Sequence, residues 1–164
     1  MSLPSGEPGR MAFLFRVVGR EADHLRITTE RVFARPMTVE RAAGLGADID
    51  DAERVEAFVA RFSRLQDTLG DKLLPVVLTA LGEPVGAVID NLDRAERLGL
   101  IPGADDWMAA RRLRNRMVHE YVEDPALLAD ALRMGHAQVA MLLFAEAGFR
   151  TEAVRRGWVG APSN

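Results

Sequence analysis

Apolar residues recur at intervals of three and four along most of the chain, the spacing of one face of an α-helix. The first run covers residues 11–33 and stops before Pro36, which we expect to end a helix there. The second run, over residues 55–73, is the most regular in the chain, and we expect Pro75 to kink or break it. The first half of the chain therefore predicts two long helices.

Three more helices are expected in the second half. One covers the apolar positions of residues 85–98, and the next begins near Trp107 and runs through a cluster of arginines. The last carries its apolar period through residues 128–143. Asp124 is expected to be its N-cap, Pro125 its first residue, and Gly148 its C-cap. Because no alternating strand pattern survives, the sequence predicts an all-α, up-and-down helical bundle of about five helices.

The chain has the length of one domain, at 164 residues. We expect a single helical domain at residues 10–150, preceded by a disordered, Pro/Gly/Ser-rich stretch at residues 1–9 and followed by a tail at residues 151–164. Asp48, Asp50 and Asp51 could suggest a cation site, but helix capping is the expected role of these aspartates.

Composition excludes several kinds of site. The absence of cysteine excludes a disulfide framework, a zinc ribbon and a thiol nucleophile. The three histidines are dispersed, and neither an HExxH motif nor a phosphate-binding P-loop occurs, so we expect no metal and no cofactor. The chain shows no secretory signal and no apolar run of membrane-spanning length, which predicts a cytoplasmic protein. A net charge of −3 means that any nucleic-acid contact depends on a local patch.

Such a patch occurs in the segment RRLRNRMVHEY, residues 111–121. Trp107, Arg114 and Tyr121 are seven residues apart and so share one stripe of a helix, the stripe expected to face the core. Trp107 is expected to pack there. A buried arginine needs a partner, so Arg114 either pairs with a carboxylate of a neighbouring helix or subunit, which the geometry favours, or binds an anion in a cleft.

His119 adds a group that can move a proton near neutral pH. It is separated from Arg114 by roughly 140° around an ideal helix, so two copies of the pair across a dimer axis would form a better site than one. Arginine can stabilise an anionic phosphorane. With RNA as substrate the 2′-hydroxyl is an internal nucleophile, and neither a metal nor a protein nucleophile is needed.

These residues resemble a known family. RNRMVHEY, residues 114–121, matches the Arg-x4-His-x-Tyr motif of HEPN domains. AERLGLIPGADDW, ahead of it, resembles the lead-in of the HepT-like branch, and EAFVARFSRLQDTL resembles the second helix of that branch. The resemblance covers about residues 50–147.

The resemblance implies a helical homodimer with metal-independent ribonuclease activity, often the toxin of a bacterial toxin–antitoxin pair whose partner is a minimal nucleotidyltransferase. By position it makes Arg114 and His119 catalytic, Tyr121 the site of nucleotide modification, and Asn115 a supporting polar residue. Arg111 and Arg116 are expected to help bind RNA. The motif is equally compatible with a non-catalytic partner subunit that holds a nucleotide or substrate for a separate nucleotidyltransferase.

Overall fold

The structure is a bundle of antiparallel helices. It is a computed structural model that describes the fold of residues 7–161, with all side chains of that range except those of residues 7, 8 and 119–123. The helical elements are α1 Glu7–Val32, α2 Val39–Ala43, the 3₁₀ turn η1 Leu45–Ala47, α3 Ile49–Asp67, the π turn η2 Thr68–Leu73, α4 Leu74–Ala80, α5 Val88–Arg97, α6 Ala104–Glu123 and α7 Pro125–Arg155. Residues 7–161 contain no strand, and the predicted all-α bundle is confirmed.

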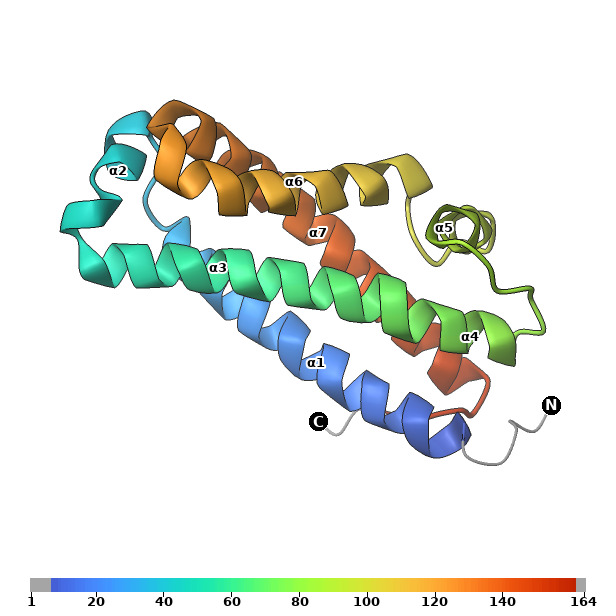
Figure 1. The fold of residues 1–164 in the computed structure, drawn as a ribbon. Helices are drawn as coiled ribbons and strands as arrows, with labels where there is room; N and C mark the ends of the chain where they lie inside the picture. The colour runs from blue at the N-terminus through green and yellow to red at the C-terminus, as the bar shows by residue number, and fades with distance from the viewer. Residues whose placement is uncertain (1–6, 162–164) are drawn as a thin grey trace.

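Four long rods make up the bundle: α1, the continuous run of α3, η2 and α4, then α6 and α7 (Figure 1). Each rod runs opposite to the one before it, so the topology is up-and-down as predicted. The short helices α2 and α5 lie at opposite ends of the bundle (Figure 1). They connect the first rod to the second and the second rod to the third.

The first and last rods, α1 and α7, are longer than the sequence pattern indicated. α1 begins at Glu7, three residues ahead of the expected start of the domain at residue 10, and α7 continues to Arg155, five residues past the expected end of the domain at residue 150. Gly148 was expected to cap α7 but lies inside the helix. A Cβ there would stand 3.4 Å from the carbonyl oxygen of Leu100, which is an ordinary van der Waals contact.

Pro75 does not break the second rod, contrary to expectation. The N–H of Leu74 donates to the carbonyl of Leu69, a five-residue spacing that defines a π turn directly before the proline. This turn widens the helix ahead of Pro75, which then occupies the first turn of α4, where a missing N–H is tolerated. The helix passes through the proline as one rod.

A half-buried carboxyl, that of Glu21, lies beside the π turn. The hydroxyl of Thr68 donates to Oε1 of Glu21, at 3.1 Å, while Oε2 is buried without a hydrogen-bond partner among the described residues. Burial raises the pKa of Glu21 above its usual value, and the hydrogen bond and the positive charges of Arg64 and Lys72 oppose that rise. Glu21 is therefore a weak point in the contact between α1 and η2.

The third predicted helix packs differently from its expected apolar stripe. Val85, Ile89 and Leu98 were expected on the buried face, but they are exposed by 47%, 43% and 43%. α5 starts only at Val88, and Asn91 is buried instead. The Asn91 side chain accepts from the N–H of Gly86 and donates to its carbonyl, and so it fixes the entry to the helix.

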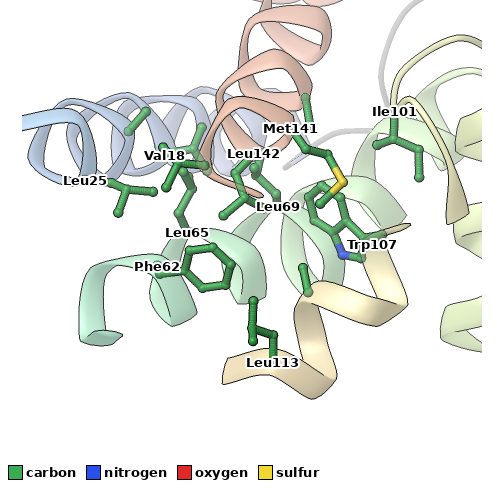
Figure 2. Packing of buried hydrophobic residues seen from close by; sticks show 14 of the residues in the cluster. Val18, Leu25, Phe62, Leu65, Leu69, Ile101, Trp107, Leu113, Met141 and Leu142 are labelled. Carbon is green, nitrogen blue, oxygen red and sulfur yellow. The ribbon is translucent and has the colours of Figure 1, made fainter. Parts of the chain in front are cut away.

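The hydrophobic core is formed by one face of each long rod. Trp107 is 1% exposed and packs beside Leu69 of the second rod and Met141 of α7 (Figure 2). Phe62 and Leu65 fill the layer next to it (Figure 2). The expectation that Trp107 is a core residue, and not a stacking platform for a nucleic-acid base, is confirmed by this burial.

α7 is more apolar than the other long helices α1, α3 and α6. Its length and mean hydropathy reach those of a membrane-spanning helix, although charged and polar residues such as Asp130, Arg133 and Glu146 divide it into short apolar runs. Its buried residues, from Leu128 to Ala153, belong to the same hydrophobic cluster as those of α1, α3 and α6. A helix of this composition is found both in the core of a bundle and across a membrane.

Candidate active site on α3 and α6

α6 turns one apolar face to the core. The residues of this face recur every three or four positions: Ala104, Trp107, Ala110, Leu113 and Met117 are all buried. The helix is unbroken from Ala104 to Glu123, so the five-residue step from Arg114 to His119 lies on regular helix. The side chains of His119 and Tyr121 lie outside the described residues.

The Arg114 side chain points toward the second rod. Its guanidinium forms a salt bridge with Asp67, at the end of α3, and the two side chains are 23% and 44% exposed. The prediction that Arg114 pairs with a carboxylate of a neighbouring helix is confirmed. Because both partners remain partly solvated, the pair stabilises the fold by at most about 1 kcal/mol.

Arg111 repeats the arrangement one turn earlier on α6. Its Nη1 lies 3.1 Å from Oδ1 of Asp71 in the π turn. Asp67 and Asp71 are four residues apart on one rod, and Arg111 and Arg114 are three apart on the antiparallel rod, so the two pairs stand side by side. Two arginines of the motif thus share one surface.

An apolar groove continues from Arg114 along α6. We call it the α3–α6 groove; its volume is about 450 Å³ and it is lined by Glu56, Val59, Ala60 and Ser63 of α3 and by Met117 and Val118 of α6. Val118, the residue after the buried Met117, is 57% exposed. The buried face of α6 is centred on Leu113 and Met117, and this leaves Val118 on the solvent side of the groove.

The other predicted side chains lie elsewhere on α6. Arg112 and Asn115 are exposed. Arg116 reaches toward α7, where its Nη2 lies 3.7 Å from Asp130 and its Nη1 lies 3.7 Å from the sulfur of Met134. The structure therefore brings Arg111 and Arg114 together and separates Arg116 from them.

The described residues hold no group of three histidine or acidic side chains that could bind a metal ion. Asp48 caps α3, as expected, by accepting from the N–H of Asp51 at 3.1 Å. Asp51 does not cap a helix; it is buried and receives two hydrogen bonds from Arg41, at 2.8 and 2.7 Å. The bonds from Arg41 lower the pKa of Asp51.

Asp67 and Asp71 are the site residues that sequence reasoning missed. The available signal was a pair of acids four residues apart on one predicted helix, facing two arginines three apart on another. This signal identifies partners only when the two helices are known to be antiparallel neighbours, a fact that the periodicity of each helix does not contain.

Comparison of the chain with known protein families, with curated protein sequences and with solved structures finds no match. The resemblance to HEPN domains therefore depends on the motif in α6 and on the sequence around it.

Proposed function

We propose that the protein is a metal-independent ribonuclease of HEPN type that acts as a homodimer, with Arg114 and His119 of both copies in a shared cleft. The observation that carries the proposal is the surface beside the motif: Arg111 and Arg114 stand together at one end of an open apolar groove, and an unbroken helix leads from them to His119. An anion site and a surface for a second copy lie next to each other.

The chemistry needs only groups that the chain possesses. The imidazole of His119 removes the proton of an RNA 2′-hydroxyl, and the 2′-oxygen attacks the adjacent phosphorus. The bond from phosphorus to the 5′-oxygen breaks, that oxygen takes up a proton, and a 2′,3′-cyclic phosphate remains. The guanidinium of Arg114 stabilises the added negative charge on phosphorus in the transition state.

The ion pair with Asp67 is compatible with this role. A partly exposed salt bridge is weak, so a dianionic phosphorane can compete with one carboxylate for the guanidinium. Arg111 and its partner Asp71 lie on the same side and can add a contact to the RNA backbone.

The α3–α6 groove supports the dimer. Val118 at its edge is 57% exposed, and Val59, Ala60 and Met117 line it, so a second copy that covers the groove removes apolar surface from water. A two-fold axis near Val118 brings the two copies of α6 together, with both motifs on one cleft.

We further propose that the protein is the cytoplasmic toxin of a toxin–antitoxin pair and that a minimal nucleotidyltransferase silences it by transferring AMP from ATP to the hydroxyl of Tyr121. The bond between the α- and β-phosphates of ATP breaks in this step, and pyrophosphate leaves. The added phosphate places a negative charge two residues from His119, where it competes with RNA for the arginines. Tyr121 is the single tyrosine of the chain, so intact mass after co-expression with the transferase should show one added AMP in the wild type and none in Tyr121→Phe.

A second candidate function is a non-catalytic partner subunit that holds substrate for the nucleotidyltransferase. The observation in its favour is that both arginines of the site, Arg111 and Arg114, are already paired with carboxylates of the same chain. Such pairing suits a structural role as well as a catalytic one.

Incubation of the purified protein with RNA and with DNA of the same sequence, each with and without EDTA, separates the two candidates. A ribonuclease of the proposed type cleaves RNA and not DNA, leaves 2′,3′-cyclic phosphate ends, and is unaffected by the chelator. RNA that stays intact under all conditions would favour the partner subunit.

A further inference from the structure

A second pocket lies where residues 33–38, between α1 and α2, meet α7. Figure 1 shows α2 at one end of the bundle. We call it the α2 pocket; it has a volume of about 450 Å³ and is lined by residues 33–38 on one side and by Arg133 and His136 of α7 on the other. Its volume falls within the range of small-molecule sites. The proposed ribonuclease activity assigns no role to this pocket or to the segment after Pro36 that builds it.

The walls of the pocket are held in place by hydrogen bonds. Nε of Arg133 donates to the carbonyl of Met37 at 2.7 Å, which fixes the guanidinium against the segment. Nη1 of Arg41 donates to the carbonyl of Arg35 at 2.8 Å, while its other nitrogens bind the buried Asp51. Groups that are fixed before a ligand arrives lose little entropy when it binds.

The pocket carries positive charge in a chain that is negative overall. Among its described lining residues are two arginines and a histidine, and none is acidic. Arg35 lies 3.1 Å from Asp51, but this carboxylate is shared with Arg41, so one negative charge serves two guanidinium groups. Arg35 remains 62% exposed and free to turn its other nitrogens toward an anion.

One wall offers a flat aromatic surface. The ring of His136 stacks on Phe33 with centroids 4.0 Å apart and an interplanar angle of 7°. Phe33 in turn packs edge-on against Phe58 of the core, at 5.1 Å. The rings are therefore anchored, and because His136 is exposed, its outer face can receive a second flat group.

We propose that the α2 pocket binds a phosphate ester that carries a flat ring, a ligand of the size of a mononucleotide, with the phosphate on Arg35 and Arg133 and the ring against His136. Guanidinium groups match phosphate oxygens in geometry and charge, and stacking on an aromatic face tolerates any base. The shared chemistry is that of a phosphorylated nucleoside, whether free or part of a strand. This site is separate from Arg114 and does not depend on cleavage.

Calorimetric titration of the full chain with UMP, uridine and inorganic phosphate tests the proposal. We expect saturable binding of one UMP per chain, tighter than that of uridine or of phosphate alone. A deoxyribose dinucleotide, which lacks the 2′-hydroxyl and cannot be cleaved by the proposed mechanism, identifies the source: tighter binding than UMP indicates a strand, and weaker binding indicates a free nucleotide. UMP that does not bind, or binds no more tightly than phosphate, would overturn the proposal.

Variants locate the ligand. Arg35→Gln and Arg133→Gln should each raise the dissociation constant for UMP by roughly 10-fold or more, the usual effect of losing one charge-assisted hydrogen bond. Arg16→Gln, which removes an equal charge beside Phe13 on α1, should leave it unchanged, as should Arg114→Ala. Circular dichroism checks that Arg133→Gln is folded. If Arg133→Gln unfolds, the binding constant of Arg35→Gln still tests the proposal. Loss of UMP binding in Arg114→Ala, or an equal loss in Arg16→Gln, would contradict the assignment.

Discussion

Asp51 and Asp67 are both partners of arginine, but their surroundings differ. The carboxylate of Asp51 is 4% exposed and binds Arg41, itself 8% exposed, through two nitrogens. Asp67 is 44% exposed and pairs with Arg114 at the edge of a groove. Removing one member of a buried pair leaves an unpaired charge inside the protein, whereas solvent replaces a lost partner at the surface.

Asp51→Asn should therefore lower the free energy of unfolding by about 3–5 kcal/mol, and the matched variant Asp67→Asn should lower it by less than about 1 kcal/mol. Urea denaturation at neutral pH measures both. Because the pKa of Asp51 is lowered in the folded state, its contribution is present above the unfolded pKa, about 3.9, and is lost as the pH falls through the folded value. Equal losses in the two variants would show that burial does not distinguish the pairs.

The pKa of Glu21 is shifted in the opposite direction from that of Asp51. Burial raises its pKa, so the fold favours the protonated form; the stabilisation is present below the unfolded pKa, about 4.3, and is lost as the pH rises through the folded value. Glu21→Gln keeps an acceptor for the hydroxyl of Thr68 and removes the charge. At pH 7 this variant should raise the melting temperature by about 1–3 °C, and at pH 4 the gain should shrink. A gain that is the same at both pH values would rule out the charge as its cause.

At the scale of elements, the π turn η2 packs closely against α6, where Gly70 lies next to Trp107. A Cβ built on Gly70 would stand 2.9 Å from Nε1 of Trp107 and 3.4 Å from its ring carbon Cε2. The indole is fully buried and cannot move aside, so glycine is required for the helix and the ring to touch.

Gly70→Ala should cost about 1–3 kcal/mol of stability by overpacking this contact. Gly46→Ala is the control, because a Cβ on Gly46 meets no atom within 4 Å. Thermal unfolding of the two variants beside the wild type gives the comparison. If Gly70→Ala is as stable as Gly46→Ala, the approach of Trp107 to the π turn does not limit the packing.

Structural features that depend on residues within one helix were predicted well from the sequence. The caps at Asp48 and Asp124 and the end of α1 before Pro36 depend on residues a few positions apart. Pro75 was misread because a π turn upstream accommodates it. Asp51 was misread because its partner Arg41 lies on a different element, which no helical period reveals.

The exposed side of α5 and the exposed Val118 have the same origin. An apolar stripe shows which face of a helix is suited to burial, but the neighbouring rods decide how much of it is covered. For the candidate site, the sequence supplied the motif residues, and the structure added Asp67, Asp71 and the groove, which arise only where two rods meet.

At the scale of the whole molecule, the proposed dimer depends on the α3–α6 groove. Val118→Glu places a charge at its exposed apolar edge and should convert a dimer into a monomer at micromolar concentration. Ile27→Glu changes a similarly exposed apolar residue, 52%, on α1, and should leave the dimer intact. Light scattering coupled to size-exclusion chromatography gives the mass of each variant. A wild-type protein with the mass of one chain would contradict the dimer.

The central claim is that Arg114 and His119 cleave RNA without a metal. Its most direct measurement is the initial rate of RNA cleavage in the presence of EDTA by the wild type, Arg114→Ala, His119→Ala and Arg112→Ala, all shown to be folded by circular dichroism. Loss of a general base or of a group that stabilises the transition state lowers rates by about 100-fold or more, so the first two variants should lose at least that much. Arg112 is exposed and lies outside the ion pairs with the second rod, so Arg112→Ala should keep most of the activity. Cleavage by His119→Ala at the rate of the wild type would contradict the account.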